Sequence, residues 1–278
     1  MTVGLVSLHG GHSDYGDGAG RLDDFALAAA NQGMLAFGFT EHMPRRKKYW
    51  YPTENPERHS FQWYQGYVRD ARQVQSRFQG RIEILVGAEL ELIPGEEEFL
   101  GEFLSEFKLD YAVGSVHFVR DLGFDYSPEY YGRAISQCGG FEAFCLDYLE
   151  TMEAMLEKVS FQVLGHFDLF KVHSTEPIML SDKALDRIDR LMRRIAAAGR
   201  LLDINANGLS KPCREIYPSV QILRLARKHG VEVTLGDDSH SPQGVGRNLE
   251  AALEHLRHAG YAEITYLKPD GSRPKLRI

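Results

Sequence analysis

The feature that most constrains the fold of this chain is a regular alternation of short apolar runs with longer segments of helical period. The apolar or β-branched runs have the length of strands and lie at residues 3–8, 35–40, 82–90, 111–116, 161–164, 201–205, 231–235 and 263–267. Segments with the period of an α-helix lie between them, at residues 22–32, 61–78, 96–107, 141–158, 181–198, 218–229 and 248–259. This alternation predicts parallel β/α units, and about seven units favour a closed α/β barrel over an open sheet.

The chain shows no sign of a division into domains. Hydrophobic residues make up 43% of its 278 residues, enough for a sizeable core, and no linker, low-complexity stretch or shift in charge interrupts it. We therefore expect one domain over residues 1–278. The segment KPDGSRP at residues 268–274 predicts the turn of a C-terminal β-hairpin.

The composition argues against several kinds of partner. With 39 acidic and 32 basic residues the net charge is −7, so the overall charge does not attract nucleic acid or an anionic membrane. The three cysteines have no paired spacing, which favours a reducing compartment. Neither a secretory signal nor an apolar run of about 18 residues is present. We expect a cytoplasmic protein, as a monomer or a homo-oligomer, that acts on a small molecule.

Histidines gather at one kind of position in this chain. Six of the eleven lie at or just after the carboxyl end of a predicted strand: His9, His12, His42, His117, His166 and His240. Acidic residues share these positions, namely Asp14, Asp17, Glu41, Glu89, Asp168, Asp237 and Asp238. The carboxyl ends of the strands of a β/α barrel meet at one face, where such folds carry their active sites. The sequence therefore predicts that many imidazoles and carboxylates lie close together.

Imidazole nitrogens and carboxylate oxygens are ligands for divalent zinc, iron and manganese. So many carboxylates at one face would repel one another unless cations neutralised them. The set is also too large for one tetrahedral ion. We expect at least two metal ions, or three, and the residue types do not distinguish zinc from iron or manganese.

The motifs HGGH, TEH, GAE, GSVHF, GHFD and GDDSH occur in this order between His9 and His240. The ordered series resembles the polymerase-and-histidinol-phosphatase (PHP) family of metal-dependent phosphoesterases, and its histidinol-phosphatase branch in particular. The resemblance implies an irregular seven-stranded β/α barrel with a three-metal cluster at the carboxyl-end mouth. It also implies metal ligation by His9, His12, Asp17, His42, Glu89, His117, His166, Asp238 and His240. Glu89 would be the bridging carboxylate.

Two motifs depart from the family pattern. The family's first motif is His-x-His, which places both rings on one face of a strand, whereas two glycines separate His9 from His12. A bulge or turn at these glycines would restore the convergence, and the choice between Asp14 and Asp17 stays open. In the last motif the family reads Gly-Ser-Asp-x-His, so Asp237 stands at the serine position.

The substrate phosphate needs local cations in an acidic protein. The segment NANGLSKPCREIYPS resembles the family's phosphate-contacting stretch, but Ser210 stands where the family commonly has Arg. An ammonium cannot grip phosphate through two parallel hydrogen bonds as a guanidinium does. Loop cations beyond the strand ends are the remaining candidates: Lys171, Lys211, Arg214 and Arg247. The basic and aromatic run RRKKYWY at residues 45–51 predicts a lid that admits substrate.

The resemblance implies hydrolysis of a phosphomonoester, with L-histidinol phosphate as the expected substrate in histidine biosynthesis. We expect attack by a metal-bridging hydroxide, because divalent ions both activate water and neutralise phosphoryl oxygens. The proton for the leaving oxygen would come from Asp238, His240 or a metal-bound water, and Glu89 completes the catalytic set. Histidinol carries a cationic amine, for which Glu215 is the candidate partner.

Other reaction classes compete with this interpretation. Another PHP phosphoesterase would act on a nucleotide or a general phosphomonoester. A metal-dependent amidohydrolase would use a similar barrel, but no lysine stands at the fourth strand's end, where His117 lies. A non-catalytic PHP module would have lost ligands that are nearly complete here. A serine or cysteine nucleophile is not supported, since no Gly-x-Ser-x-Gly elbow occurs.

Overall fold

Seven parallel strands form the centre of the molecule. The computed structural model describes residues 4–278. The strands pair in the order β1 (Val6–Ser7), β2 (Ala36–His42), β3 (Glu83–Glu91), β4 (Tyr111–Ser115), β7 (Val163–Leu164), β8 (Leu201–Asn205) and β9 (Val233–Gly236), with every ladder parallel. The backbone N–H of Leu8 donates to the carbonyl of Leu235 at 2.8 Å, so the first and last strands also meet. The expected irregular seven-stranded β/α barrel is confirmed.

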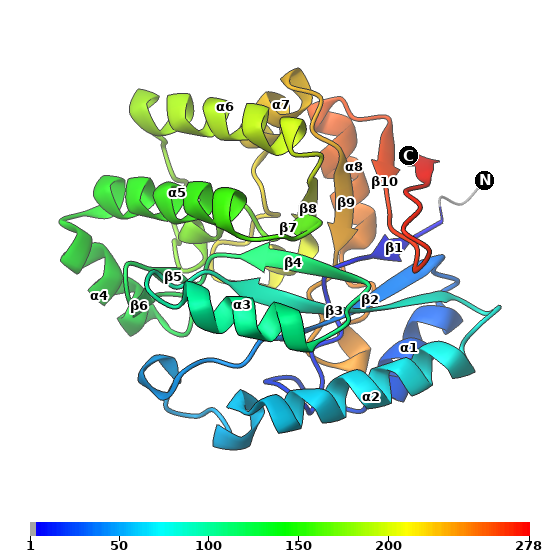
Figure 1. The fold of residues 1–278 in the computed structure, drawn as a ribbon. Helices are drawn as coiled ribbons and strands as arrows, with labels where there is room; N and C mark the ends of the chain where they lie inside the picture. The colour runs from blue at the N-terminus through cyan, green and yellow to red at the C-terminus, as the bar shows by residue number, and fades with distance from the viewer. Residues whose placement is uncertain (1–3) are drawn as a thin grey trace.

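Helices surround the strands on the outside (Figure 1). They are α1 (Leu22–Asn31), α2 (Phe61–Arg77), α3 (Glu97–Glu106), α4 (Pro128–Cys138), α5 (Phe141–Lys158), α6 (Asp182–Ala197), α7 (Val220–Lys228) and α8 (Leu249–Ala259). Three of them begin at a serine whose hydroxyl accepts a backbone N–H of the first turn: Ser60, Ser127 and Ser181. The helices bury apolar side chains in the common core, as α6 does with Ile188, Leu191 and Ile195.

Two insertions after β4 were not predicted from the sequence. A small hairpin, β5 (Phe118–Val119) with β6 (Leu122–Gly123), follows the fourth strand, and α4 comes next. The pair Ser127-Pro128 was an available helix-start signal, because serine suits the N-cap and proline the first helical position. The first strand is also shorter than the predicted run 3–8, of which Val3 lies outside the described residues.

The Tyr111 side chain of β4 is buried in the barrel interior, beneath the carboxyl-end face. Its ring fits because Gly38 on β2 and Gly87 on β3 have no side chains, and a Cβ on Gly38 would collide with the Tyr111 hydroxyl. That hydroxyl donates to the carbonyl of Leu8 at 2.8 Å. The contact fixes the end of β1 directly before His9.

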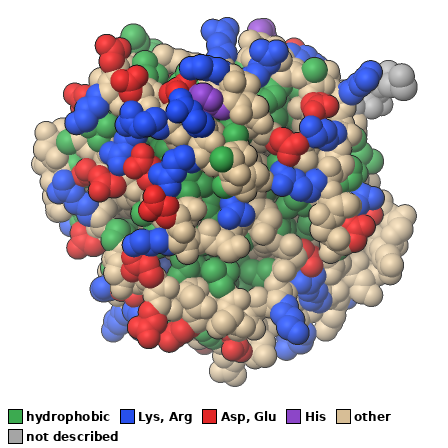
Figure 2. Space-filling view, turned by 45° about the horizontal axis from the view of Figure 1, so that its top comes forward, with side chains coloured by type: hydrophobic (Ala, Val, Ile, Leu, Met, Phe, Trp, Pro, Cys, Tyr) green, Lys and Arg blue, Asp and Glu red, His purple; other side chains and the backbone are tan. Residues whose placement is uncertain are grey.

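The chain ends in the expected hairpin, in which β10 (Glu263–Thr265) pairs antiparallel with β11 (Lys275–Arg277). The C-terminal end lies on the same side of the molecule as β1 (Figure 1). On the face shown in Figure 2, Lys and Arg side chains are interspersed with Asp and Glu rather than gathered into one basic field. No helix within residues 4–278 combines the length and apolarity needed to cross a membrane.

Candidate metal centre

The strands bring the predicted histidines and carboxylates to one end of the barrel. His42 ends β2 and Glu89 lies on β3, while His117 and His166 each lie two residues beyond a strand end. The segments after β1 and β9 supply the remaining members, His9, His12, Asp238 and His240. The parallel direction of all seven strands is what makes these distant residues neighbours.

Glu89 lies at the centre of this group and is 1% exposed. Its Oε1 is 3.1 Å from Nε2 of His166 and 3.2 Å from Nε2 of His9. Its Oε2 is 3.2 Å from Nδ1 of His42, and Nε2 of His117 is 3.4 Å from Oε1. One carboxylate therefore faces imidazoles from four separate strand ends.

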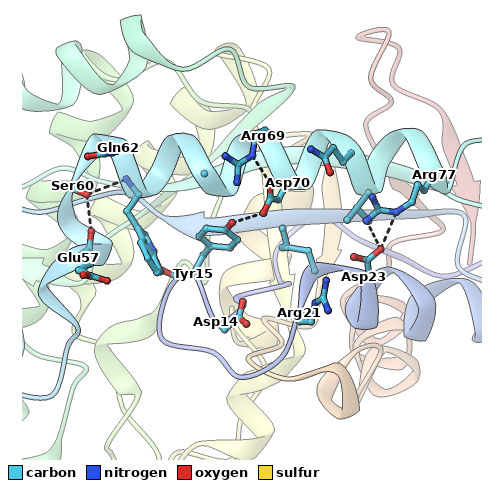
Figure 3. A pocket seen from close by; sticks show the side chains of 15 residues that line it. Asp14, Tyr15, Arg21, Asp23, Glu57, Ser60, Gln62, Arg69, Asp70 and Arg77 are labelled. Atoms are coloured by element: carbon cyan, nitrogen blue, oxygen red, sulfur yellow. Dashed lines mark hydrogen bonds and ion pairs between the residues drawn. The ribbon is translucent and has the colours of Figure 1, made fainter.

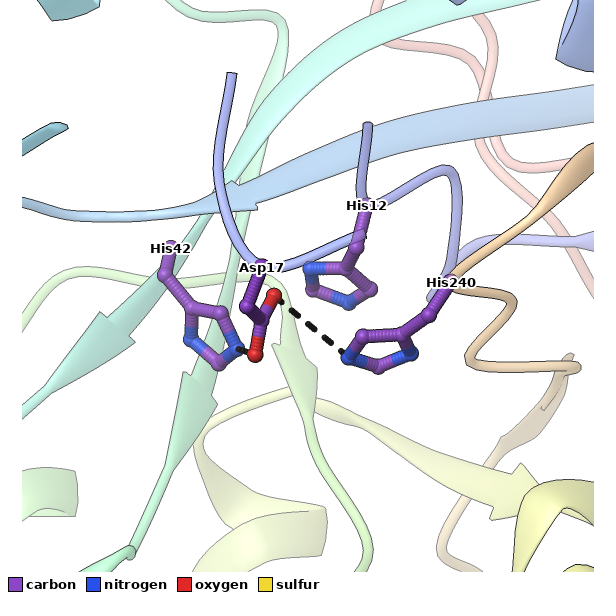
Figure 4. Close-up of side chains that lie close together, drawn as sticks. All are labelled: His12, Asp17, His42 and His240. Carbon is purple, nitrogen blue, oxygen red and sulfur yellow. Dashed lines mark ion pairs between the residues drawn. The ribbon is translucent and has the colours of Figure 1, made fainter. Parts of the chain in front are cut away.

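A second group of possible ligands, drawn in Figure 4, shares His12 and His42 with the surroundings of Glu89. His12, Asp17, His42 and His240 converge there, with Asp17 between two rings. The carboxylate oxygens of Asp17 are 3.8 Å from Nε2 of His42 and 3.6 Å from Nε2 of His240. The His12 and His240 rings stack with centroids 4.4 Å apart. This group joins the loop after β1 to the strand ends of β2 and β9.

The donor atoms fit divalent metal ions. Within residues 4–278, five groups have ligand atoms that all lie within 4.8 Å of one another: His12/Asp17/His42/His240, His9/His12/Glu89, His9/His166/Asp238, His42/Glu91/His117 and Glu89/His117/His166. Buried nitrogens in them lack a hydrogen-bond partner, including Nε2 of His9 and both ring nitrogens of His12. Nε2 of His117 faces Nε2 of His166 at 3.2 Å, which suits two lone pairs directed at a common cation. Unsatisfied inward nitrogens of this kind are what ligands require.

Hydrogen bonds on the outward side orient three of the rings. Nδ1 of His9 lies 2.8 Å from Oδ2 of Asp203, Nδ1 of His117 lies 2.8 Å from Oε1 of Glu91, and Nδ1 of His240 lies 2.9 Å from the carbonyl of Asp238. Such partners fix the ring and leave Nε2 free for a metal.

Sequence reasoning missed Glu91 and Asp203. Both had a signal: Glu91 is two residues beyond Glu89 and so shares its strand face, and Asp203 is an acid inside the apolar run LLDIN.

The pKa shifts show how strongly these charges interact. Burial acts against the charged form of each group, yet Asp238, Glu41 and Glu89 raise the pKa of His12 to about 10. Burial likewise opposes a charged His117, but Glu89 and other carboxylates raise its pKa to about 9. For His42 burial prevails and its pKa falls to about 4. The carboxylates thus create a negative potential that stabilises positive charge at the centre.

The HGGH motif reaches this geometry through a turn. Gly11 has a φ of 68°, a conformation that favours glycine, and the rings of His9 and His12 lie 5.9 Å apart on either side of it. Gly10 packs against Asp237, where a Cβ would collide with Oδ1. Asp237 is buried, which raises its pKa to about 6, and it accepts the N–H groups of Ser239 and Gly246. The extra glycine of HGGH and the aspartate at the family's serine position, the two departures from the family pattern, therefore contact each other through Gly10 and Asp237.

The structure places Asp14 and Asp17 at two different sites. Asp17 joins the group in Figure 4. Asp14 lines a groove of about 800 Å³ on the outside, between α2 and the segment before α1 (Figure 3). In that groove Tyr15 donates from its hydroxyl to Asp70 at 2.6 Å, and Trp63 donates to the Tyr15 carbonyl at 2.7 Å. These contacts fix the loop that carries Asp17 against α2.

A cavity of about 250 Å³ opens onto the metal-binding groups. Of the predicted phosphate-binding cations Lys211 lines it, whereas Arg247 lines a neighbouring pocket together with Lys211 and His240. Lys171 is buried against Asp168 and Glu215, 2.9 Å from each. Arg214 is exposed, with a φ of 50°. The cavity walls instead contain residues that sequence reasoning did not select, among them Arg58, Asp125 and Tyr126.

Fold and site together define a class of protein: a parallel β/α barrel whose strand-end histidines and carboxylates suit several divalent metal ions. A model of the PHP domain matches residues 8–207. The chain belongs to the PHP domain family, and the resemblance drawn from its motifs is confirmed.

Relatives span nearly the whole chain. The "probable histidinol-phosphatase" of Schizosaccharomyces pombe is 34% identical, over 91% of this chain and 86% of its own length. The protein of the same name from Deinococcus radiodurans is 32% identical, over 95% and 97%. The crystal structure of histidinol phosphate phosphatase from Lactococcus lactis, complexed with zinc, L-histidinol and phosphate, has a TM-score of 0.73. It is 19% identical and covers 96% of this chain and 98% of its own, so it supports the fold.

The contact between Gly10 and Asp237 can be tested by stability. We expect Gly10→Ala to lower the free energy of unfolding by about 1–3 kcal/mol, because its Cβ has no room. Asp237→Ser removes that obstacle together with the hydrogen bonds to Ser239 and Gly246. The double variant should therefore be more stable than the sum of the single effects, by about 0.5–3 kcal/mol. Urea unfolding at one fixed metal concentration measures this, and additive effects would contradict the contact.

Proposed function

We propose that this protein hydrolyses L-histidinol phosphate to L-histidinol and phosphate in a metal-dependent reaction. The observation that carries the proposal is the buried donor set around Glu89, in a chain that is 34% identical to a protein named as a probable histidinol-phosphatase. The fold shared with a phosphatase solved with zinc, histidinol and phosphate supports the same substrate and zinc as a resident metal.

We assign the donor set to three metal ions. His9, His12, Glu89 and Asp238 would hold one, Glu89 with His117 and His166 a second, and Asp17 with His42 and His240 a third. The second set is one of the groups whose ligand atoms lie within 4.8 Å of one another, and the third is part of another. The first adds Asp238 to the group His9/His12/Glu89, since its Oδ1 lies 3.3 Å from Nε2 of His12. Glu89 belongs to two of these sets, which is the bridging role expected from the resemblance. Asp203 and Glu91 would orient His9 and His117 from behind.

Bound divalent cations would lower the pKa of a water ligand and neutralise phosphoryl oxygens. The protein's own side chains exclude water, position the proton donor and hold the phosphate. The buried walls exclude bulk water from the centre and so strengthen the electrostatic interactions in it. Asp238 and His240 line the cavity with their side chains 3.8 Å apart, and we assign to this pair the positioning of the proton donor for the leaving oxygen. Lys211 lines the same cavity and contributes positive charge toward the phosphate.

The cationic amine of histidinol needs a carboxylate, and the cavity offers Asp125 rather than Glu215. Glu215 is outside the cavity lining, pairs with Lys171 at 2.9 Å and has a side chain 45% exposed. Asp125 lines the cavity, and its Oδ1 accepts the Tyr51 hydroxyl at 2.8 Å. No Lys, Arg or His within residues 4–278 forms an ion pair with it, so the carboxylate is available to a substrate cation. We therefore assign amine recognition to Asp125.

The substrate assignment is tested by phosphate release from the purified, metal-analysed protein. We expect kcat/KM for histidinol phosphate to exceed that for p-nitrophenyl phosphate, nucleoside monophosphates and sugar phosphates by about a hundredfold or more, equal to about 2.7 kcal/mol. Metal-dependent release without preference would keep the reaction class and reject the substrate.

The role of Glu89 is tested by counting metal. Glu89→Gln keeps the shape of the side chain but removes the charge shared by two proposed sites, so we expect a lower metal content and loss of activity. Glu83→Gln is the matched control, because Glu83 begins the same strand with a side chain 46% exposed. Elemental analysis of both variants beside the wild type measures the effect. A full metal complement in Glu89→Gln would reject the assignment.

Amine recognition is tested with Asp125→Asn. We expect the ratio of kcat/KM for histidinol phosphate to that for p-nitrophenyl phosphate to fall about tenfold or more, because only the first substrate carries an ammonium group. Asp121→Asn is the control, since Asp121 is exposed on the turn between β5 and β6. An unchanged ratio in Asp125→Asn would remove this residue from substrate recognition.

A further inference from the structure

Arg58 is a nearly buried guanidinium that lines the cavity above the metal-binding groups. It lies in a short 3-10 helix, Pro56–His59, whose first turn is capped by the Asn55 side chain. The residue is 5% exposed, and it shares the cavity wall with Asp17 and His42. Its sequence context does not mark Arg58 as a substrate-binding residue, since one arginine in a polar loop is ordinary.

The donors of Arg58 are not used by the protein. Within the described residues its guanidinium donates no hydrogen bond, and its one ion pair is with Oε1 of Glu54 at 3.6 Å. Glu54 already accepts from Arg45, from the backbone N–H of Tyr51 and from His59. A guanidinium has five N–H donors, and burying them without partners costs free energy. The unused donors of Arg58 are therefore available to a group in the cavity.

Two other buried cations, Arg45 and Lys171, differ from Arg58 in this respect. Both terminal nitrogens of Arg45 are bound, one to Glu91 at 3.1 Å and the other to Glu54. Lys171 is held by Asp168, Glu215 and the carbonyl of Ile216. Arg45 thus supports Glu91 behind His117, and Lys171 holds two loops together. Arg58 is the arginine on this wall whose terminal donors stay open.

Arg58 lines the same cavity as members of the group in Figure 4. Asp17, His42 and His240 border that cavity together with Arg58, which is 5% exposed. An anion in the cavity can therefore contact both the guanidinium and the metal-binding groups.

The segment around Arg58 is packed as a fixed wall. Trp50 stacks on His59 with centroids 4.8 Å apart and donates from its indole N–H to the carbonyl of Arg45 at 2.8 Å. His59 accepts the backbone N–H of Arg45 at 3.1 Å. The basic and aromatic run expected to form a lid thus holds Arg58 in place, and such preorganisation lowers the entropic cost of binding an anion.

We propose that Arg58 binds the phosphoryl oxygens of the substrate, beside the group formed by Asp17, His42 and His240. The inference rests on the proposed function, because it takes the substrate to be a phosphate monoester. A planar guanidinium binds two phosphate oxygens through parallel hydrogen bonds. Arg58 then supplies, from the loop after β2, the guanidinium that Ser210 does not supply from the loop after β8.

The test measures inhibition of the metal-loaded enzyme by inorganic phosphate, with p-nitrophenyl phosphate as reporter. We expect Arg58→Met to raise the inhibition constant of phosphate about 10- to 100-fold, and Arg58→Lys to raise it less. Adding guanidinium ion to Arg58→Ala should restore part of the phosphate affinity. Arg46→Met is the matched control, since Arg46 belongs to the same segment but is half-exposed and pairs with Glu96 at 2.7 Å; it should keep the wild-type constant.

Metal content and thermal unfolding of each variant separate direct phosphate binding from an effect through Asp17. A wild-type inhibition constant in Arg58→Met overturns the inference, as does a loss of metal that accounts for the change. If the wild type ignores histidinol phosphate but phosphate inhibits it through Arg58, the substrate assignment fails while the inference holds. If inorganic phosphate does not bind the wild-type holoenzyme by calorimetry, both are rejected.

Discussion

The Glu89 carboxylate, buried among the imidazoles of His9, His42, His117 and His166, is the constraint on which the rest of this structure depends. A buried charge is costly unless protonated imidazoles or bound cations pair with it. The four rings come from four strand ends, so the carboxylate can be compensated only when the whole barrel is assembled. Cation binding and closure of the barrel therefore stabilise the same state.

The outward contacts of the site show how the barrel holds its rings. The Tyr111 hydroxyl crosses the interior and donates to the carbonyl of Leu8. The next residue, His9, has its Nδ1 2.8 Å from Oδ2 of Asp203. Arg45 holds Glu91, which in turn orients His117. His9 and His117 are thus each fixed by a carboxylate from another strand. These intermediate contacts are buried and hydrogen-bonded, so they orient the donor atoms before a metal binds.

Much of this arrangement could be predicted from the sequence, for a physical reason. In a parallel barrel a residue's place at the carboxyl end of a strand nearly fixes its place in space, so the strand-end histidines and Glu89 could be expected to meet. The position of a loop residue in space does not follow from its position in the sequence in this way. Arg58 and Asp125 reach the cavity from a 3-10 turn and from the segment after an unpredicted hairpin, and nothing in the spacing locates them. The contact between Gly10 and Asp237 was also hidden, because two departures far apart in sequence become related only through a packed interior.

In the proposed function, the metal-binding histidines and carboxylates form the floor of the cavity, and loop residues such as Arg58 and Asp125 form its walls. The floor would bind any phosphate monoester through its cations, since a metal ion and a phosphoryl oxygen attract each other whatever the leaving group is. Discrimination must then come from side chains that contact the rest of the substrate or fix the phosphate's orientation. Arg58 and Asp125 lie on segments that contribute little to the barrel core, as loops of such folds generally do. If Arg58 and Asp125 act as proposed, a chain that keeps the floor and exchanges these walls would keep the reaction and change the substrate. The metal-binding motifs would then identify the chemistry, and the loops after β2 and β6 would select the substrate.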